Sequence, residues 1–220
     1  RIAWLIAVEN ISEGSIMAVT FTNKAAAEMR HRIQDTLSKH AQSNLLFGMW
    51  IGTFHSIAHR LLRAHHLDVN LPQDFQILDS EDQLRLVKRL MKLHNYDDKA
   101  FPPKQACWYI NNKKDEGLRP QDIDDFGDRQ EKEWIKIYQI YQDTCDRAGL
   151  VDFAELLIRA YELFAKKPVI LQRYQQRFQH ILVDEFQDTN KIQYAWIKIL
   201  AGNTGKVMIV GDDDQSIYGW

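Results

Sequence analysis

A strand–helix–strand pattern near the end of the sequence constrains the fold more than any other feature. Residues 180–183 and 206–210 are continuous apolar runs, and residues 191–200 between them have the apolar spacing of a helix. Continuous apolar strands joined by a helix are typical of the buried middle of a parallel sheet. The pattern therefore predicts an α/β fold in which these two strands are neighbours.

The same alternation of strand and helix occurs twice in the first third of the chain. A β-branched run at 15–21 leads into a predicted helix at 24–38, and a second run at 49–52 leads into a helix at 54–65. These segments supply two further strands for the same parallel sheet.

The middle of the chain, from about residue 79 to 179, has helical spacing throughout and no convincing strand. Asp79 or Ser80 is the expected N-cap of its first helix. The predicted helices cover residues 81–94, 103–114, 131–148, 152–165 and 168–177. We therefore expect an α/β domain made of residues 1–78 and 179–220, interrupted by an all-helical subdomain of residues 79–178.

Composition narrows the possible functions. The 220 residues are 45% hydrophobic and carry a formal net charge of −2, so the chain can build a core and does not coat nucleic acid by its total charge. Its two cysteines match no paired-ligand spacing, which favours reduced thiols in a cytoplasmic protein. No apolar run is long enough to span a bilayer, so we expect no membrane partner.

Two carboxylates follow the strand at 180–183. At the carboxyl end of a parallel strand, Asp184 is placed to hold Mg²⁺ on a nucleotide, and Glu185 to orient an attacking water. The alternative is that an Asp-Glu pair after a strand only begins a solvated turn or caps a helix. A polar loop, 211–218, follows the next strand at the same expected edge, where Gln215 is suited to sense a γ-phosphate.

Four motifs occur in the order that the UvrD/Rep/PcrA group of superfamily 1 DNA helicases has them. Residues 184–188 (DEFQD) resemble that group's Walker B box, and residues 211–220 (GDDDQSIYGW) resemble its motif III. Residues 20–29 (TFTNKAAAEM) are similar to motif Ia, and residues 52–56 (GTFHS) to motif Ib. Residues 149–153 also fit a segment late in the group's helical subdomain, so the resemblance covers essentially the whole chain.

The resemblance implies a RecA-like (P-loop NTPase-type) motor domain that uses ATP and Mg²⁺. It assigns Asp184 to Mg²⁺, Glu185 to activation of water, and Gln187 and Gln215 to contacts near the γ-phosphate. It also implies 3′ to 5′ translocation on single-stranded DNA and unwinding of duplex at junctions, in repair and replication, with DNA-repair proteins as possible partners.

Aromatic and small polar residues gather at the ends of the first two predicted strands and in the last loop. Proteins that bind single strands combine aromatic platforms for bases with small polar donors for phosphates. Together with the resemblance, this pattern predicts a DNA-binding set: Thr20, Phe21, Thr22, Asn23, Thr53, Phe54, His55, Tyr218 and Trp220. Trp220 is the first candidate for base stacking and Tyr218 the second.

The phosphate-binding loop G-x-x-x-x-G-K-[ST] does not occur in these 220 residues. Residues 1–6 resemble the end of a helix that follows this loop in the family, so we expect an excised fragment that hydrolyses no ATP alone. Two alternatives remain. One is a non-catalytic module that binds single-stranded DNA or a partner with a helicase-derived fold, and the other is the helicase part of a helicase-nuclease such as RecB.

Overall fold

The computed structural model describes residues 1–38, 48–203 and 205–212. The chain groups into two compact units. The first, here called the α/β unit, is Arg1–Leu61 with Ala160–Trp220, and the second, the helical unit, is Leu62–Arg159.

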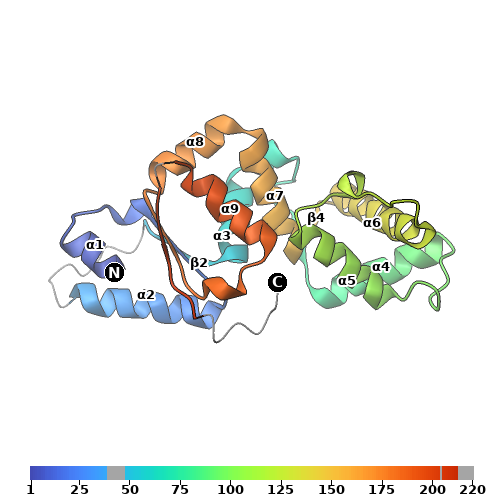
Figure 1. The fold of residues 1–220 in the computed structure, drawn as a ribbon, viewed down its shortest axis with the longest axis horizontal. Coiled ribbons are helices and arrows are strands. Elements are labelled where there is room, and N and C mark those ends of the chain that lie inside the picture. The colour runs from blue at the N-terminus through green and yellow to red at the C-terminus, as the bar shows by residue number, and fades with distance from the viewer. Residues whose placement is uncertain (39–47, 204, 213–220) are drawn as a thin grey trace. The chain divides into compact units, whose positions relative to one another are not determined.

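A parallel sheet of four strands forms the centre of the α/β unit (Figure 1). Its strands are β1 (Ile16–Thr20), β2 (Trp50–Thr53), β5 (His180–Val183) and β6 (Lys206–Ile209), in the order β2-β1-β5-β6. Each neighbouring pair is parallel, so the carboxyl ends of all four strands meet at one edge. The predicted α/β fold with a parallel sheet is confirmed.

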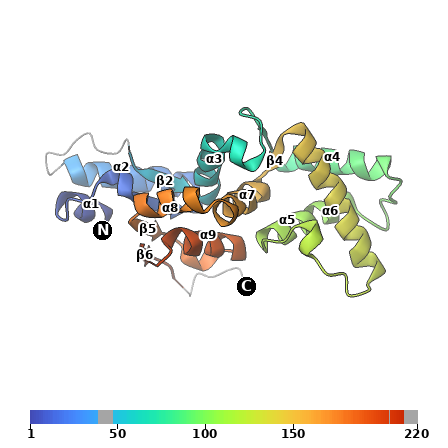
Figure 2. The same ribbon diagram turned by 90° about the horizontal axis from the view of Figure 1, so that it is seen from above.

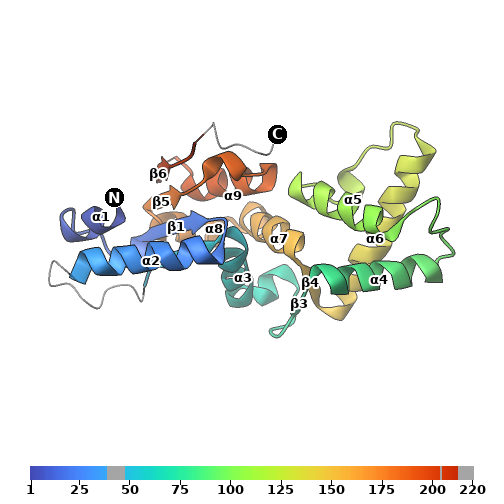
Figure 3. The same cartoon turned by 90° about the horizontal axis from the view of Figure 1, so that it is seen from below.

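One face of the sheet is covered by α1 (Ile2–Ala7) and α2 (Asn23–Ser38), and Figure 3 shows α2 lying along β1. The helices place Leu5 and Ile33 against Ala18 of β1 in one apolar cluster. A short 3-10 helix, η1 (Glu13–Ser15), leads from α1 into β1.

The other face is covered by aromatic side chains from later helices of this unit. The helices are α3 (Phe54–Ala64), α7 (Phe153–Lys166), α8 (Pro168–Arg177) and α9 (Lys191–Ala201). The Trp196 ring lies 6.3 Å from Phe54 and 6.2 Å from Phe164, and the Trp50 ring lies 5.8 Å from Tyr174. Helices on both faces explain why β1 is buried at every position.

The last strand, β6, differs from the expectation for its burial. Its sequence predicts a strand in the middle of the sheet, but β6 lies at the end of the strand order and Ile209 is 52% exposed. The predicted strand is therefore confirmed, but its predicted burial is wrong among the described residues. A strand is buried only when other strands and helices cover it, and the sequence of the strand alone does not specify them.

Three helices build the helical unit: α4 (Ser80–Leu93), α5 (Pro103–Asp115) and α6 (Arg129–Ala148), which Figure 2 shows from above. Asp79 caps α4 by accepting from the Asp82 amide at 2.8 Å, as predicted. The 3-10 helices η2 (His66–Val69) and η3 (Pro120–Asp122) belong to the same unit. Tyr109, Trp134 and Tyr138 lie in its apolar core.

A short parallel pair of strands was not predicted: one strand directly precedes the segment 79–178 that was expected to be wholly helical, and the other lies within it. β3 (Gln76–Leu78) pairs with β4 (Leu150–Asp152), joining segments more than 70 residues apart. Three-residue strands give no detectable alternation, so the sequence could not reveal them.

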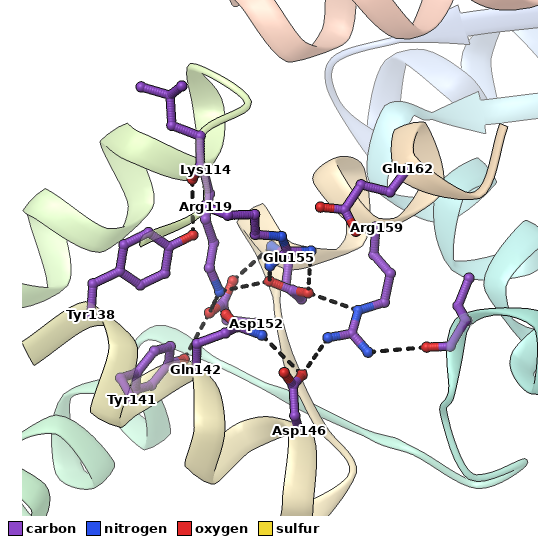
Figure 4. A network of polar contacts seen from close by, with 12 residues as sticks. Lys114, Arg119, Tyr138, Tyr141, Gln142, Asp146, Asp152, Glu155, Arg159 and Glu162 are labelled. Atoms are coloured by element: carbon purple, nitrogen blue, oxygen red, sulfur yellow. Dashed lines mark hydrogen bonds and ion pairs between the residues drawn. The ribbon is translucent and has the colours of Figure 1, made fainter. Parts of the chain in front are cut away.

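A buried network of charges lies beside β4 (Figure 4). Lys114 is fully buried, and its Nζ lies 2.6 Å from Asp152 and 2.9 Å from Glu155. Arg119 donates to both oxygens of Glu155, at 2.8 and 2.9 Å, and Arg159 donates to the same carboxylate at 2.7 Å. The segment 149–153 therefore has a structural role, because its Asp152 joins α5 to the start of α7.

The boundaries of the compact units differ from the residue-79 and residue-178 boundaries predicted for the insertion. The units divide inside α3 and α7. The aromatic contacts of Phe164 and Tyr174 explain the later boundary, because they pack the end of α7 and one face of α8 against the core of the α/β unit.

Two further sequence expectations concern the cysteines and the membrane. Cys107 and Cys145 are free thiols, and burial raises the pKa of Cys107 to about 11 and that of Cys145 to about 12. Within the described ranges, no helix combines the length and the apolar character needed to cross a membrane.

Candidate nucleotide and nucleic-acid sites

The predicted carboxylate pair lies at the carboxyl edge of the sheet. The Asp184 amide donates to the Val19 carbonyl at 2.9 Å and so extends the pairing of β5 with β1 by one residue. Glu185 then adopts a left-handed conformation, with φ of 54°, and the chain turns into η4 (Phe186–Asp188). A non-glycine residue in this region is strained, and such strain concentrates at functional sites. The turn leaves the Glu185 side chain exposed beside a half-buried Asp184.

Gln187 connects the carboxylate turn to the loop after β6. Its Nε2 donates to Glu185 Oε2 at 2.6 Å, and its Oε1 accepts from the Asp212 amide at 3.1 Å. A Cβ atom on Gly211 would lie 2.6 Å from the same Oε1, so only glycine leaves room for this arrangement. The structure therefore brings together two motifs, the DEFQD segment and the start of the GDDDQ loop.

The donor atoms at this edge suit a hydrated Mg²⁺ ion. Mg²⁺ prefers carboxylate oxygens and usually keeps several waters, so one or two protein carboxylates and the phosphates of a nucleotide suffice. Asp184 and Glu185 provide such oxygens. Among the described residues there is no group of three or more His, Cys, Asp or Glu side chains that would hold a metal without other ligands. Asp188 Oδ1 is also buried at this turn and has no hydrogen-bond partner within the described part of the chain.

Two threonines of the predicted DNA-binding set cap helices at the same edge. Thr22 Oγ1 accepts from the Ala25 amide at 3.0 Å, at the start of α2, and Thr53 Oγ1 accepts from the Ser56 amide at 3.1 Å, at the start of α3. β1 and β2 are in register at their last residues, so these helix starts follow adjacent strand ends. Backbone amides at helix N-termini favour anions such as phosphate.

The other residues of that set divide into surface and core positions. Asn23 is exposed, and Phe21 and His55 are half-buried; burial lowers the pKa of His55. Thr20 is 0% exposed and Phe54 is 1% exposed. The prediction that these two side chains contact DNA directly is not supported, because Thr20 lies inside the sheet and Phe54 packs between Phe21 and Trp196.

Three predicted site residues, Gln215, Tyr218 and Trp220, lie outside the described residues. Sequence reasoning also missed one participant, the main-chain amide of Asp212. A backbone donor cannot be recognised from a side-chain pattern. Gly211, the residue before it, was the available signal, because glycine allows another group to approach the backbone closely.

Comparison with known proteins identifies the family. The whole chain, residues 1–220, matches the family described as UvrD/REP helicase N-terminal domain. It is 91% identical to DNA helicase II of Haemophilus influenzae and 70% identical to DNA helicase II of Escherichia coli, in each case over the whole chain and 30% of the relative. It is 38% identical to the ATP-dependent DNA helicase PcrA of Staphylococcus epidermidis, again over the whole chain and 30% of that protein. The chain thus spans about a third of the length of these relatives, and it belongs to the UvrD/REP helicase family, whose N-terminal domain it represents.

Proposed function

We propose that this chain is part of the motor of an ATP-dependent DNA helicase that moves along single-stranded DNA and unwinds duplex. The observation that carries the proposal is the Gln187 side chain, which connects Glu185 to the backbone of the loop after β6. In a helicase motor, the state of the bound nucleotide must change the affinity for DNA. Gln187 supports such coupling, because it joins the carboxylate turn to the loop after β6.

The nucleotide side of the proposal uses the residues at the ends of β5 and β6. Bound ATP with Mg²⁺ supplies the phosphoryl group whose hydrolysis drives movement. Asp184 would hold Mg²⁺, Glu185 would orient the attacking water, and Gln187 and Gln215 would contact the region of the γ-phosphate. These roles follow from carboxylates at the end of a parallel strand and from the family resemblance.

The nucleic-acid side uses the helix starts after β1 and β2. Thr22, Asn23 and Thr53 lie where two helix N-termini follow adjacent strands, and His55 lies beside them. Phe21, Tyr218 and Trp220 are the proposed aromatic contacts. Translocation from 3′ to 5′, action at duplex junctions and DNA-repair partners come from the resemblance and are part of the proposal. A cytoplasmic location is also proposed, and it comes from the two cysteines without paired-ligand spacing.

The decisive experiment measures Mg²⁺-dependent ATP hydrolysis with and without single-stranded DNA. The assay compares this chain with a longer chain that covers the full length of the relatives, and with Glu185→Gln in the longer chain. We expect DNA-stimulated hydrolysis only in the longer chain, and its loss in Glu185→Gln. The matched control is Glu9→Gln, which removes an exposed carboxylate of the same unit and should leave hydrolysis unchanged.

Two outcomes would contradict the proposal. Full activity of Glu185→Gln would remove this residue from the chemistry. Absence of DNA stimulation in the longer chain would favour a non-catalytic module that binds single-stranded DNA or a partner.

A further inference from the structure

Arginines gather around the outer edge of β2, beside the segments 20–29 and 52–56. Arg30 of α2 donates through Nη2 to the Ile51 carbonyl at 2.8 Å. The Arg60 guanidinium of α3 lies 4.2 Å from the centre of the Trp50 ring, and that of Arg177 lies 5.4 Å from it. Arg30 and Arg60 are exposed, and for neither does an acidic partner occur within the part of the chain that the structure describes.

A cavity of about 380 Å³ lies between Arg30 and Arg60. Its other lining residues come from α2, β2 and α3 and include Asn23, Gly52 and Ser56, with no acidic residue. A Cβ atom on Gly52 would collide with Ser56 Oγ, so glycine keeps this part of the lining as bare backbone. The Ser56 hydroxyl donates to the Thr53 carbonyl at 2.9 Å, so the donors left for an anion in this open cavity are two guanidinium groups and the Asn23 amide.

Positive charge extends beyond the cavity. Burial raises the pKa of the Tyr174 hydroxyl, and the positive charges of Arg173, Arg177 and Arg60 oppose that rise. These three arginines therefore lie close enough to one tyrosine to act on it together. Arg177 is also fixed by hydrogen bonds to the carbonyls of Gly14 and Gly48, at 3.2 and 3.4 Å. An anion with several charges along its length fits this surface better than a single small ion.

The cavity adjoins the proposed nucleic-acid site. Asn23 belongs to both, and Ser56 lies in the first turn of α3 after Thr53. From Thr53 back to Trp50 is three residues of strand, or about 10 Å at roughly 3.3 Å per residue. A strand bound at the carboxyl ends of β1 and β2 needs to continue only this far to bring a phosphate between the two arginines.

We propose that the cavity between Arg30 and Arg60 is a phosphate subsite that takes a backbone phosphate of a nucleic-acid strand continuing from the carboxyl edge of the sheet around β2. This inference rests on the proposed function, because the strand reaches the cavity from the DNA-binding site proposed above. Arg30 and Arg60 bind the phosphate through charge-assisted hydrogen bonds, and Arg173 and Arg177 draw the following part of the strand toward α8.

The test measures binding of a short fluorescent oligothymidine to the chain over a range of salt concentrations. Arg30→Gln and Arg60→Gln should each weaken binding about tenfold at low salt. The double variant should also lower the slope of log affinity against log salt by about 0.7, the contribution of one phosphate in single-stranded DNA. Arg32→Gln is the matched control, because Arg32 lies on the same helix, is 78% exposed and pairs with Glu28.

A third variant keeps the test valid if loss of an arginine disturbs the fold, since Arg30 also holds the Ile51 carbonyl. Ser56→Glu places a carboxylate in the cavity and retains both arginines. It also completes a capping box with Thr53 at the start of α3, so the helix should form as before, which circular dichroism and the thermal midpoint would check. We expect Ser56→Glu to weaken oligothymidine binding as strongly as either arginine variant.

The outcomes separate this inference from the proposed function. If the unchanged chain binds oligothymidine and all three variants behave like Arg32→Gln, the subsite is wrong and the proposed DNA binding stands. If the unchanged chain binds no oligothymidine, both fail. If polyglutamate competes with oligothymidine at equal charge concentration and loses affinity in the same variants, the surface is one for acidic peptides and the assignment to nucleic acid is overturned.

Discussion

The Gln187 side-chain amide lies 2.6 Å from the Glu185 carboxylate, as its donor, while its oxygen accepts from the Asp212 amide. One side chain therefore fixes both the orientation of an acidic residue in a strained turn and the start of the next strand's loop. The Glu185 side chain is exposed and has no other described hydrogen-bond partner, so Gln187 is what limits its orientation. The first prediction concerns this bridge.

Loss of the bridge should reduce ATP hydrolysis without reducing stability. In the full-length protein, Gln187→Ala removes the amide, and Gly211→Ala should displace it because the new Cβ would lie 2.6 Å from Oε1. We expect each variant to lower the DNA-stimulated rate, and the double variant to be no slower than Gln187→Ala alone, because both act on one contact. Additive losses in the double variant would show that Gly211 acts by another route.

Most of the elements at this site were predictable from sequence, and their burial was not. Continuous apolar runs gave the strands, and the position of Asp184 and Glu185 after such a run gave the carboxylate turn. Thr20 and Phe54 were predicted as DNA contacts because a small polar and an aromatic residue at a strand end, within the segments that resemble motifs Ia and Ib, suit phosphates and bases. A motif fixes residue order, but it does not specify which side chains the fold buries: helices cover both faces of β1, and Phe54 of α3 packs against Trp196.

The charge network of the helical unit shows a second limit of sequence reasoning. Lys114 and Asp152 lie 38 residues apart, and nothing in either neighbourhood marks a buried ion pair. In the sequence, Lys114 is indistinguishable from Lys113 beside it, and both are typical of the cations found in the last turn of an exposed helix. The pair becomes visible only when the fold removes both side chains from water.

The second prediction is that Lys114→Met strongly destabilises the helical unit. The substitution leaves the carboxylates of Asp152 and Glu155 buried with one cation fewer, which typically costs about 3–5 kcal/mol. Lys113→Met is the matched control. Lys113 is 23% exposed and lies 3.6 Å from Glu131, so it should cost at most about 1 kcal/mol. Urea unfolding followed by circular dichroism measures both, and equal midpoints for the two variants would contradict the prediction.

The third prediction is that this unit loses stability in acid through Glu155. Burial acts to raise the pKa of Glu155, but the positive charges of Lys114, Arg119 and Arg159 outweigh it and hold the pKa well below its usual 4.5. A carboxyl group with a lowered folded-state pKa stabilises the fold fully above its unfolded pKa. That stabilisation declines as the pH falls from about 4.5 toward the folded value.

Comparison with Glu155→Gln isolates this contribution. The difference in unfolding free energy between the unchanged chain and Glu155→Gln should be constant from about pH 7 to about pH 5 and should shrink below about pH 4.5. Urea midpoints at a series of pH values would measure it. A difference that stays constant into acid would mean that folding does not shift the pKa of Glu155, and it would contradict the prediction.

The fourth prediction contrasts two glycines of the helical unit that both have positive φ. Gly149 ends α6 with φ of 66°, and a Cβ there would lie 2.6 Å from Pro72 Cγ. Gly127 has φ of 82°, and nothing lies within 4 Å of its Cβ position. Gly127→Ala should therefore cost only the left-handed strain, about 1–2 kcal/mol. Gly149→Ala should cost a further ~1–3 kcal/mol, because a proline ring cannot move aside as a flexible side chain would.

Thermal or urea unfolding compares the two variants. Since the backbone strain is common to both, the difference between their unfolding free energies measures the contact with Pro72. If Pro72→Ala does not reduce that difference, the extra cost at Gly149 comes from the end of α6 itself.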